Sequence, residues 1–177
     1  MLLDGGSGND VINATAKAGN IAFDVNLNTN VVGGSGNYTI DATADGRSAG
    51  PYFGFSRLAN TVDGGSGNDH ITAYAESEFQ GYHSYIANQL FGGSGDDVLD
   101  ATARGRSNLT RDTINELHGG PGDDLLHAFN LTDSNRSSPT GITSCGAMKA
   151  TTRSKRFIPQ MGRTHYGCHQ LLGRRKW

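Results

Sequence analysis

The sequence predicts an all-β fold, a parallel β-roll or β-helix solenoid of about five coils with about 28 residues per coil, followed by a disordered tail. Three observations predict it. Glycine is abundant, at 26 of 177 residues, while proline is rare, at 4, which is unusual for an ordinary globular domain and, without a three-residue period, excludes collagen. A glycine-rich tetrapeptide recurs five times at a near-constant interval. The residues around it alternate between apolar and polar in each copy.

The charge distribution divides the chain into two regions. Residues 1–135 hold all 17 acidic residues and six Lys or Arg, a net charge of −11, whereas residues 136–177 hold nine Lys or Arg and no acid. This asymmetry predicts a repeat domain over residues 1–135 and a basic tail over residues 136–177. No apolar run reaches the roughly 18 residues of a membrane span, so we expect none. Because the chain opens directly into a repeat, we expect it to be part of a longer protein without its export signal.

The tetrapeptide is expected to form a tight turn at one edge of each coil. Gly-Gly-Ser-Gly begins at Gly5, Gly33, Gly64 and Gly92, and Gly-Gly-Pro-Gly begins at Gly119, so the spacings are 28, 31, 28 and 27 residues. Self-similarity at such a period is typical of stacked repeats.

The residues after each turn predict a strand. With the first glycine as position 1, positions 8, 10 and 12 are small or apolar and their neighbours mostly polar, which indicates a strand with one buried face. Position 8 is Ile12, Ile40, Ile71, Leu99 and Leu126; position 10 is Ala14, Ala42, Ala73, Ala101 and Ala128; position 12 is Ala16, Ala44, Ala75, Ala103 and Asn130. The alanines suit a thin core between two close sheets.

The residues before each turn predict a second strand per coil. An apolar residue stands two positions before each glycine pair: Leu3, Val31, Val62, Leu90 and Leu117. Coils paired by backbone hydrogen bonds at about 4.8 Å would stack these residues into ladders along the interior.

The turn and the start of the following strand resemble a known family. Gly5 to Asn13 reads Gly-Gly-Ser-Gly-Asn-Asp-Val-Ile-Asn and Gly92 to Asp100 reads Gly-Gly-Ser-Gly-Asp-Asp-Val-Leu-Asp. Both resemble the nonapeptide of the RTX, or haemolysin-type, calcium-binding repeats, a Ca²⁺-binding β-helix pattern. Gly64 to Thr72 and Gly119 to His127 match it too, so four of the five copies are full matches. The resemblance implies a calcium-binding β-roll over residues 1 to about 135.

The chemistry of the turn agrees with calcium as the cofactor. Ca²⁺ takes six to eight oxygen ligands at about 2.3 to 2.6 Å, and glycines allow several carbonyls to converge. An ion midway between coils about 4.8 Å apart would have ligands at about 2.4 Å on both sides. The candidate ligands are the position 6 carboxylates Asp10, Asp69, Asp97 and Asp124, the position 5 side chains Asn9, Asn68, Asp96 and Asp123, and the first glycines Gly5, Gly64, Gly92 and Gly119.

The second copy departs from the pattern because Tyr38 stands at position 6. If adjacent turns share each ion, as in the family, the better sites lie between Asp69 and Asp97 and between Asp97 and Asp124. The two sites that flank Tyr38 are then expected to be weak or empty. The family usually has two nonapeptides per coil and this chain has one, so we expect calcium along one edge only. The opposite edge, with segments 46–55, 76–85 and 104–112, varies in length.

The basic tail has three interpretations. Its Lys and Arg residues could bind a polyanion; His165, Cys168 and His169 could bind a metal; or the tail could be non-native. We favour the third. A sixth repeat is due near residue 146, and a codon frame shifted from Gly146 permits Gly-Asp-Glu-Gly-Asp-Asp-Thr-Leu-Glu-Ala-Phe, which resembles Gly119 to Phe129. The nucleotide sequence tests this frameshift hypothesis.

No catalytic motif was found: the sequence lacks a phosphate-binding loop, His-Glu-x-x-His and Gly-x-Ser-x-Gly. We therefore expect no catalytic residues and no enzyme. The resemblance implies a secreted, bacterial-type extracellular repeat module that binds calcium, with extracellular polysaccharide or a cell surface as a candidate partner and no nucleic acid. The alternative is an accessory calcium-binding region of a larger extracellular enzyme, such as a lipase, protease or polysaccharide epimerase, or of an adhesin.

Folding is expected to be coupled to calcium. Without ions, aspartates stacked about 5 Å apart would repel one another by roughly 0.8 kcal/mol per neighbouring pair even in water. The free energy of calcium binding then contributes to folding.

Overall fold

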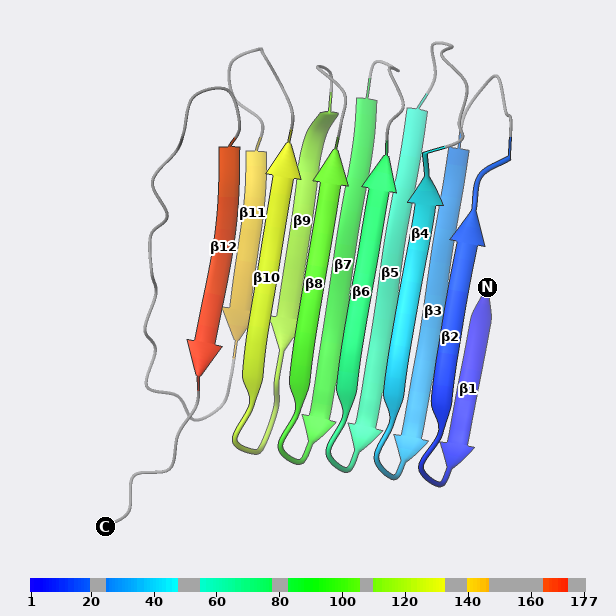
Figure 1. The fold of residues 1–177 in the computed structure, drawn as a ribbon, viewed down its shortest axis with the longest axis vertical. Helices are drawn as coiled ribbons and strands as arrows, with labels where there is room; N and C mark the ends of the chain where they lie inside the picture. Colours follow the sequence, from blue (N-terminus) through cyan, green and yellow to red (C-terminus); the bar gives the residue numbers. More distant parts are fainter. Residues whose placement is uncertain are drawn as a thin grey trace.

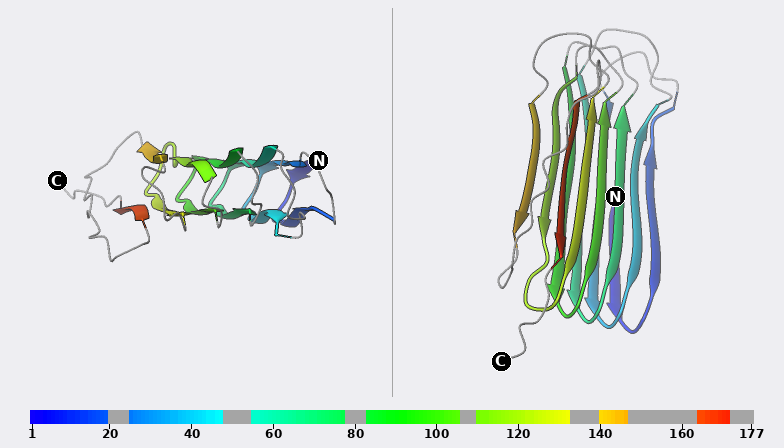
Figure 2. Two further views of the ribbon diagram at one scale, coloured as in Figure 1. Left: turned by 90° about the horizontal axis from the view of Figure 1, so that it is seen from above. Right: turned by 60° about the vertical axis from the view of Figure 1, so that its left-hand side comes forward.

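The computed structural model describes residues 1–19, 25–47, 55–77, 83–105, 110–132, 140–146 and 164–171. Its elements are all strands: β1 (Leu2–Ser7), β2 (Val11–Lys17), β3 (Val25–Ser35), β4 (Thr39–Gly46), β5 (Phe55–Ser66), β6 (His70–Ser77), β7 (His83–Ser94), β8 (Val98–Gly105), β9 (Thr110–His118), β10 (Leu125–Thr132), β11 (Thr140–Gly146) and β12 (Thr164–Leu171). Figures 1 and 2 show them in two facing layers.

Odd- and even-numbered strands form separate sheets. The first sheet has the order β1-β3-β5-β7-β9-β11 and the second the order β12-β10-β8-β6-β4-β2. Each coil contributes one strand to each sheet, so coil 1 is β1 and β2, and coil 5 is β9 and β10. The five glycine turns join the two sheets along one edge, the lower one in Figure 1. The predicted parallel β-solenoid with one glycine turn per coil is confirmed.

The register stacks like residues on like residues, as predicted. In the second sheet Ile12 pairs with Ile40, Ile40 with Ile71, and Leu99 with both Ile71 and Leu126. In the first sheet the sequence Leu3, Val31, Val62, Leu90, Leu117 forms one ladder. The hydrophobic columns therefore determine which residues of successive coils pair.

The core lies between the sheets and is thin. Its larger cluster combines the position 8 residues with the alanines of position 10 and the first-sheet ladder. A smaller cluster contains Leu58, Ile86 and the alanines at position 12. Leu3 and Ile12 are only partly buried because they belong to the first coil. Alanine at two of three inward positions allows the close approach of the sheets.

A ladder of buried polar side chains also runs through the core. Asn60 Nδ2 donates to Asn88 Oδ1 at 2.9 Å, Asn88 Nδ2 donates to Asn115 Oδ1 at 2.8 Å, and Asn115 Nδ2 donates to Asn130 Oδ1. The same Nδ2 atoms donate across to second-sheet carbonyls, at 3.0 Å to Tyr74, 2.9 Å to Thr102 and 2.9 Å to Phe129. These bonds cross-link both the coils and the sheets.

The last two strands lie within the predicted tail. β11 continues the first sheet parallel to β9, whereas β12 pairs antiparallel with β10. The structure thus has strands at 140–146 and 164–171 within residues 136–177, and the disorder expected of this region as a whole stays a prediction. The other residues of 136–177 lie outside the described part of the chain, as do residues 20–24, 48–54, 78–82, 106–109 and 133–135. Within the described residues, no helix is long and apolar enough to cross a membrane.

Candidate metal sites in the glycine turns

The second and fourth glycines of each turn give the turn its backbone shape. Gly65 and Gly93 have φ values of 97° and 105°, and Gly67 and Gly95 of 121° and 132°. L-amino acids with a side chain rarely adopt these values. A Cβ on these glycines would also collide with the backbone of the preceding coil. Glycine therefore permits both the turn and its close stacking on its neighbour.

Position 5 side chains connect each turn to the next one along the chain. Asn9 Oδ1 accepts a hydrogen bond from the Asn37 N–H at 2.7 Å, and Asn37 Oδ1 accepts one from the Asn68 N–H at 2.7 Å. Asn68 and Asp96 continue the ladder, at 2.9 Å to the Asp96 N–H and 2.8 Å to the Asp123 N–H. Three predicted ligands, Asn9, Asn68 and Asp96, thus use one side-chain oxygen to hold the stack together.

Position 6 carboxylates connect the turns in the opposite direction. Asp69 Oδ1 accepts the Tyr38 N–H at 2.8 Å, Asp97 Oδ1 accepts the Asp69 N–H at 2.8 Å, and Asp124 Oδ1 accepts the Asp97 N–H at 3.0 Å. The second oxygen, Oδ2, of these three aspartates is buried and has no hydrogen-bond partner among the described residues. A buried carboxylate oxygen without a partner is energetically costly, and a bound cation would offset that cost.

Burial changes the acidity of these groups. It raises the pKa of Asp97 to about 6 and raises the pKa values of Asp69 and Asp124 as well, while the backbone N–H bond to each carboxylate partly opposes the shift. Neighbouring carboxylates add to the increase, Asp69 and Asp124 in the case of Asp97. The turns therefore concentrate negative charge where water is largely excluded.

At the first glycines of turns 3 and 4, two oxygens converge on the place that a Cβ would take. A Cβ on Gly64 would meet Asp69 Oδ2 and lie 2.6 Å from the Gly92 carbonyl oxygen. A Cβ on Gly92 would likewise meet Asp97 Oδ2 and lie 2.7 Å from the Gly119 carbonyl oxygen. Each space thus joins a free carboxylate oxygen to a carbonyl of the next coil. These residues fit a calcium ion, which prefers oxygen ligands from carboxylates and backbone carbonyls.

Tyr38 occupies the corresponding space between the first two turns. A Cβ on Gly5 would lie 2.7 Å from Tyr38 Cε1, and one on Gly33 would lie 3.0 Å from Tyr38 Cδ2. The tyrosine is 1% exposed, and its hydroxyl donates to the Gly6 carbonyl at 2.9 Å. An aromatic ring therefore stands where the later turns have a carboxylate oxygen.

Asp10 and Gly5 differ from the other predicted ligands. Asp10 is half-buried, and its carboxylate lies beside Gly8, whose Cβ would be 3.6 Å from Oδ2, rather than beside the first glycine. Gly5 lies against the Tyr38 ring. The structure thus groups Asp69 with Gly92 and Asp97 with Gly119, and it brings neither Asp10 nor Gly5 into an equivalent pair.

Donor chemistry limits which metal could bind. Within the described residues, no three His, Cys, Asp or Glu side chains gather around one point. A site in the turns would therefore take most of its ligands from backbone carbonyls, which suits Ca²⁺ rather than a metal that prefers imidazole or thiolate.

Comparison with known proteins identifies the repeats. The family model of the RTX calcium-binding nonapeptide repeat matches four segments, residues 2–16, 57–76, 87–103 and 111–130. Each contains one of the nonapeptides with Asp at position 6, and the turn with Tyr38 lies outside them. Neither the search of curated proteins nor the search of solved structures returned a match. Through its repeats in residues 2–130, the chain belongs to the RTX calcium-binding repeat family.

Proposed function

We propose that this protein is a secreted calcium-binding repeat module in which calcium binds between adjacent turns and couples binding to folding. The principal sites lie between turns 3 and 4, with Asp69 Oδ2 and the Gly92 carbonyl, and between turns 4 and 5, with Asp97 Oδ2 and the Gly119 carbonyl. The sites next to Tyr38 are weak or empty because the ring fills that space. Bound calcium would neutralise the buried carboxylates and cross-link successive coils.

One observation carries the proposal. Three aspartates in successive turns each have a buried Oδ2 without a hydrogen-bond partner among the described residues, beside a first glycine on which a Cβ would collide with that oxygen. In a structure that served only as a scaffold, these side chains would be more stable as neutral amides. The match of the same turns to the RTX calcium-binding repeat supports calcium as the cation.

Calcium titration by calorimetry, with circular dichroism in parallel, tests this function. We expect about two well-occupied sites per chain, one for each space that joins a carboxylate to a carbonyl of the next coil, and weak or no binding of Mg²⁺, which demands octahedral geometry. Strand content should fall in EDTA and return in millimolar calcium. Absence of binding heat, or spectra that EDTA leaves unchanged, would contradict the proposal.

The variant Asp97→Asn removes one buried carboxylate charge with little change in shape. We expect calcium affinity to fall by at least about tenfold. Asp41→Asn is the matched control, because Asp41 is exposed on the outer face of β4 and is not one of the candidate ligands. Equal calcium affinities of the two variants would argue against the assigned site.

We further propose that the chain acts outside the cell as a structural or adhesive part and has no catalytic activity. Calcium at millimolar concentration outside the cell suits a protein that folds on export. Hydrolase assays of the calcium-loaded chain should show no turnover, and measurable turnover would contradict this role. A catalytic domain encoded in the same gene would instead indicate an accessory region of an enzyme.

A further inference from the structure

We propose that the first three coils hold together without calcium and that calcium orders the fifth coil onto the stack, with the fourth coil joined to the third by an ion pair at one edge only. The proposal rests on the calcium-binding function above and adds an order of assembly to it. Two features, on opposite edges of the stack, carry it: the tyrosine within the turns and a ladder of ion pairs at the other edge. Three coils are also about the smallest number of repeats that can be stable as a stack.

Tyr38 cross-links the first three turns with its own atoms. Its hydroxyl donates to the Gly6 carbonyl of turn 1 at 2.9 Å, and its ring packs against Gly5 and Gly33. Its backbone N–H donates to Asp69 Oδ1 of turn 3 at 2.8 Å. A neutral aromatic side chain thus fills the space that would otherwise require a cation, and it removes one carboxylate from the stack.

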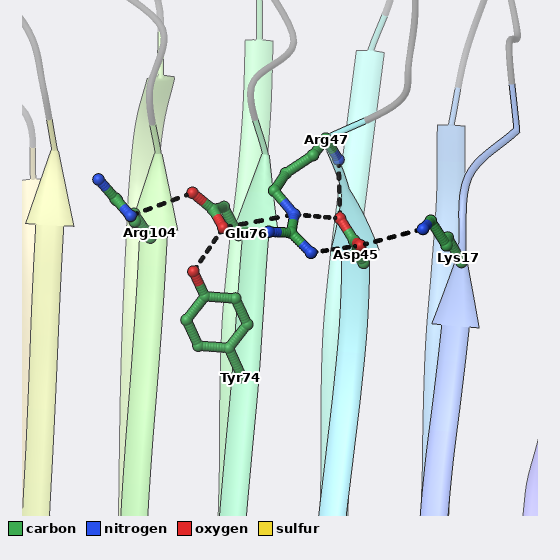
Figure 3. A network of polar contacts seen from close by, with 6 residues as sticks. All are labelled: Lys17, Asp45, Arg47, Tyr74, Glu76 and Arg104. Atoms are coloured by element: carbon green, nitrogen blue, oxygen red, sulfur yellow. Dashed lines mark hydrogen bonds and ion pairs between the residues drawn. The ribbon is translucent and has the colours of Figure 1, made fainter.

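Charged residues at position 13 cross-link coils 1 to 4 at the opposite edge (Figure 3). The register places Lys17, Asp45, Glu76 and Arg104 side by side on β2, β4, β6 and β8. Lys17 Nζ lies 3.9 Å from Asp45 Oδ2, and Arg104 Nη1 lies 3.4 Å from Glu76 Oε1. The signs run positive, negative, negative, positive, so the two acids in the middle need a cation between them.

Arg47 supplies that cation. Its Nε donates to Asp45 Oδ1 and its Nη2 to Asp45 Oδ2, each at 2.8 Å, and Nε also lies 3.6 Å from Glu76 Oε2. Asp45 is 4% exposed and Glu76 is 1% exposed. Salt screens such buried carboxylates less than exposed ones, and paired geometry makes these bonds stronger than ordinary surface ion pairs. The second and third coils are therefore joined at this edge without any ion from solution.

The fifth coil has neither a tyrosine in its turn nor a charged residue at position 13. Leu131 stands at position 13 of β10, beside Arg104, so the ladder of charges ends at the fourth coil. At the turn edge, coils 4 and 5 meet through Asp97 and Asp124, each with a buried Oδ2 that lacks a partner among the described residues. The asparagine ladder connects coil 3 to coil 4 and coil 4 to coil 5, so it does not account for a difference between these coils. The His127–Asp100 pair joins β10 to β8, but both side chains are about half exposed, so its contribution is small.

Hydrogen exchange of the full chain, followed by mass spectrometry in EDTA and in millimolar calcium, tests the order of assembly. In EDTA, we expect amides of β3 to β6 to exchange at least about tenfold more slowly than those of β9 and β10. In calcium, both groups should be protected. Uniformly fast exchange in EDTA with uniform protection in calcium would overturn this inference and leave calcium binding intact. Exchange that calcium changes nowhere, together with no binding heat, would overturn the proposed function itself.

Two variants of Tyr38 separate its ring from its hydroxyl. Tyr38→Asp restores the residue of the other four turns, so protection of β3 and β4 should become calcium-dependent and the number of bound ions should rise. Tyr38→Phe keeps the ring, so most of the calcium-free protection should remain. If Tyr38→Asp protected the first coils in EDTA as well as the wild type does, the role of Tyr38 would be refuted.

Glu76→Gln tests the other edge without touching a turn. We expect faster exchange of β3 to β6 in EDTA and an unchanged number of bound calcium ions. Unchanged exchange in this variant would contradict the contribution of the ion-pair ladder.

Discussion

At the scale of single residues, the carboxyl groups of Asp97 and Asp45 respond to the fold in opposite directions. Burial raises the pKa of Asp97 to about 6, whereas the hydrogen bonds of Arg47 lower the pKa of Asp45 to about 2. An unfolded aspartate titrates near pH 3.9, so between about pH 6 and 4 the folded chain binds more protons than the unfolded chain. Asp97 therefore favours folding as pH falls through that range. Asp45 stabilises the fold above about pH 4 and ceases to do so towards pH 2.

These opposite shifts predict a stability optimum at mildly acidic pH when calcium is absent. In EDTA, the thermal midpoint should be several degrees higher at about pH 5 than at pH 7, because protonation replaces calcium at the buried carboxylates. Asp69 and Asp124, whose pKa values are also raised by burial, act in the same direction. Thermal melts across pH measure this, and Asp97→Asn should flatten the profile. A midpoint in EDTA that rises from pH 5 to 7 would contradict it.

The first glycine of turn 4 offers a second test at this scale. A Cβ on Gly92 would enter the space shared by Asp97 Oδ2 and the Gly119 carbonyl, so Gly92→Ala should weaken calcium binding and destabilise the fold by about 1 to 3 kcal/mol. Gly19→Ala is the matched control because a Cβ there meets no atom within 4 Å. Calorimetry should show weaker calcium binding, and thermal melts a lower midpoint, for Gly92→Ala than for Gly19→Ala. Equal calcium affinities and midpoints would show that Gly92 is not part of the calcium site.

The recurrence of Asp at position 6 predicted the three aspartates that share one environment. It could not predict that the Tyr38 ring of the next coil, rather than the Asp10 carboxylate, would lie against Gly5. Nor could it show that position 5 oxygens accept backbone hydrogen bonds between coils. Asn and Asp side chains can serve equally as hydrogen-bond acceptors and as metal ligands. The repeat pattern therefore predicts which chemical group stands at a position, but the role of that group depends on the residues that surround it in the structure.

At the scale of strands, the period of two in the repeats was sufficient to predict which residues face inward and which residues pair. The asparagine ladder was not predicted, although Asn60, Asn88 and Asn115 recur at one position. Their partners include carbonyls of the facing sheet and Asn130 of β10. A sequence column shows what stacks within one sheet, but the offset between two sheets depends on the turn geometry.

Asn88 provides the test of this ladder. Asn88→Ala would remove the acceptor of Asn60 Nδ2 and the donor to Asn115 Oδ1, both of them buried. We therefore expect the free energy of unfolding of the calcium-loaded protein to fall by about 2 kcal/mol. Asn28→Ala serves as the control, because among the described side chains Asn28 bonds only its exposed neighbour Asn26. Chemical denaturation in calcium measures both. Equal, small effects would show that the ladder adds little to stability.

At the scale of the whole molecule, the two edges of the stack are cross-linked by different means. The glycine turns at one edge are suited to an ion from solution, and the other edge uses residues of the chain itself. The charges at position 13, Lys17, Asp45, Glu76 and Arg104, recur in register and were visible in the sequence. Their role was missed because the insertion of Arg47 between two acids depends on the chain path just after β4.

The separation of the edges predicts that their contributions to stability are additive. Asp97 immediately precedes β8, and Glu76 of the neighbouring β6 pairs with Arg104, seven residues further along β8, about 23 Å away at about 3.3 Å per residue. Sites so far apart without shared partners usually act independently. We therefore expect the destabilisation of the double variant Asp97→Asn/Glu76→Gln, measured by denaturation in calcium, to equal the sum of the single effects within about 0.5 kcal/mol. Only the variants with Asp97→Asn should lose calcium affinity. A large coupling energy would mean that the turns and the ion pairs stabilise one cooperative element, and the first coils could then not remain ordered when calcium is removed.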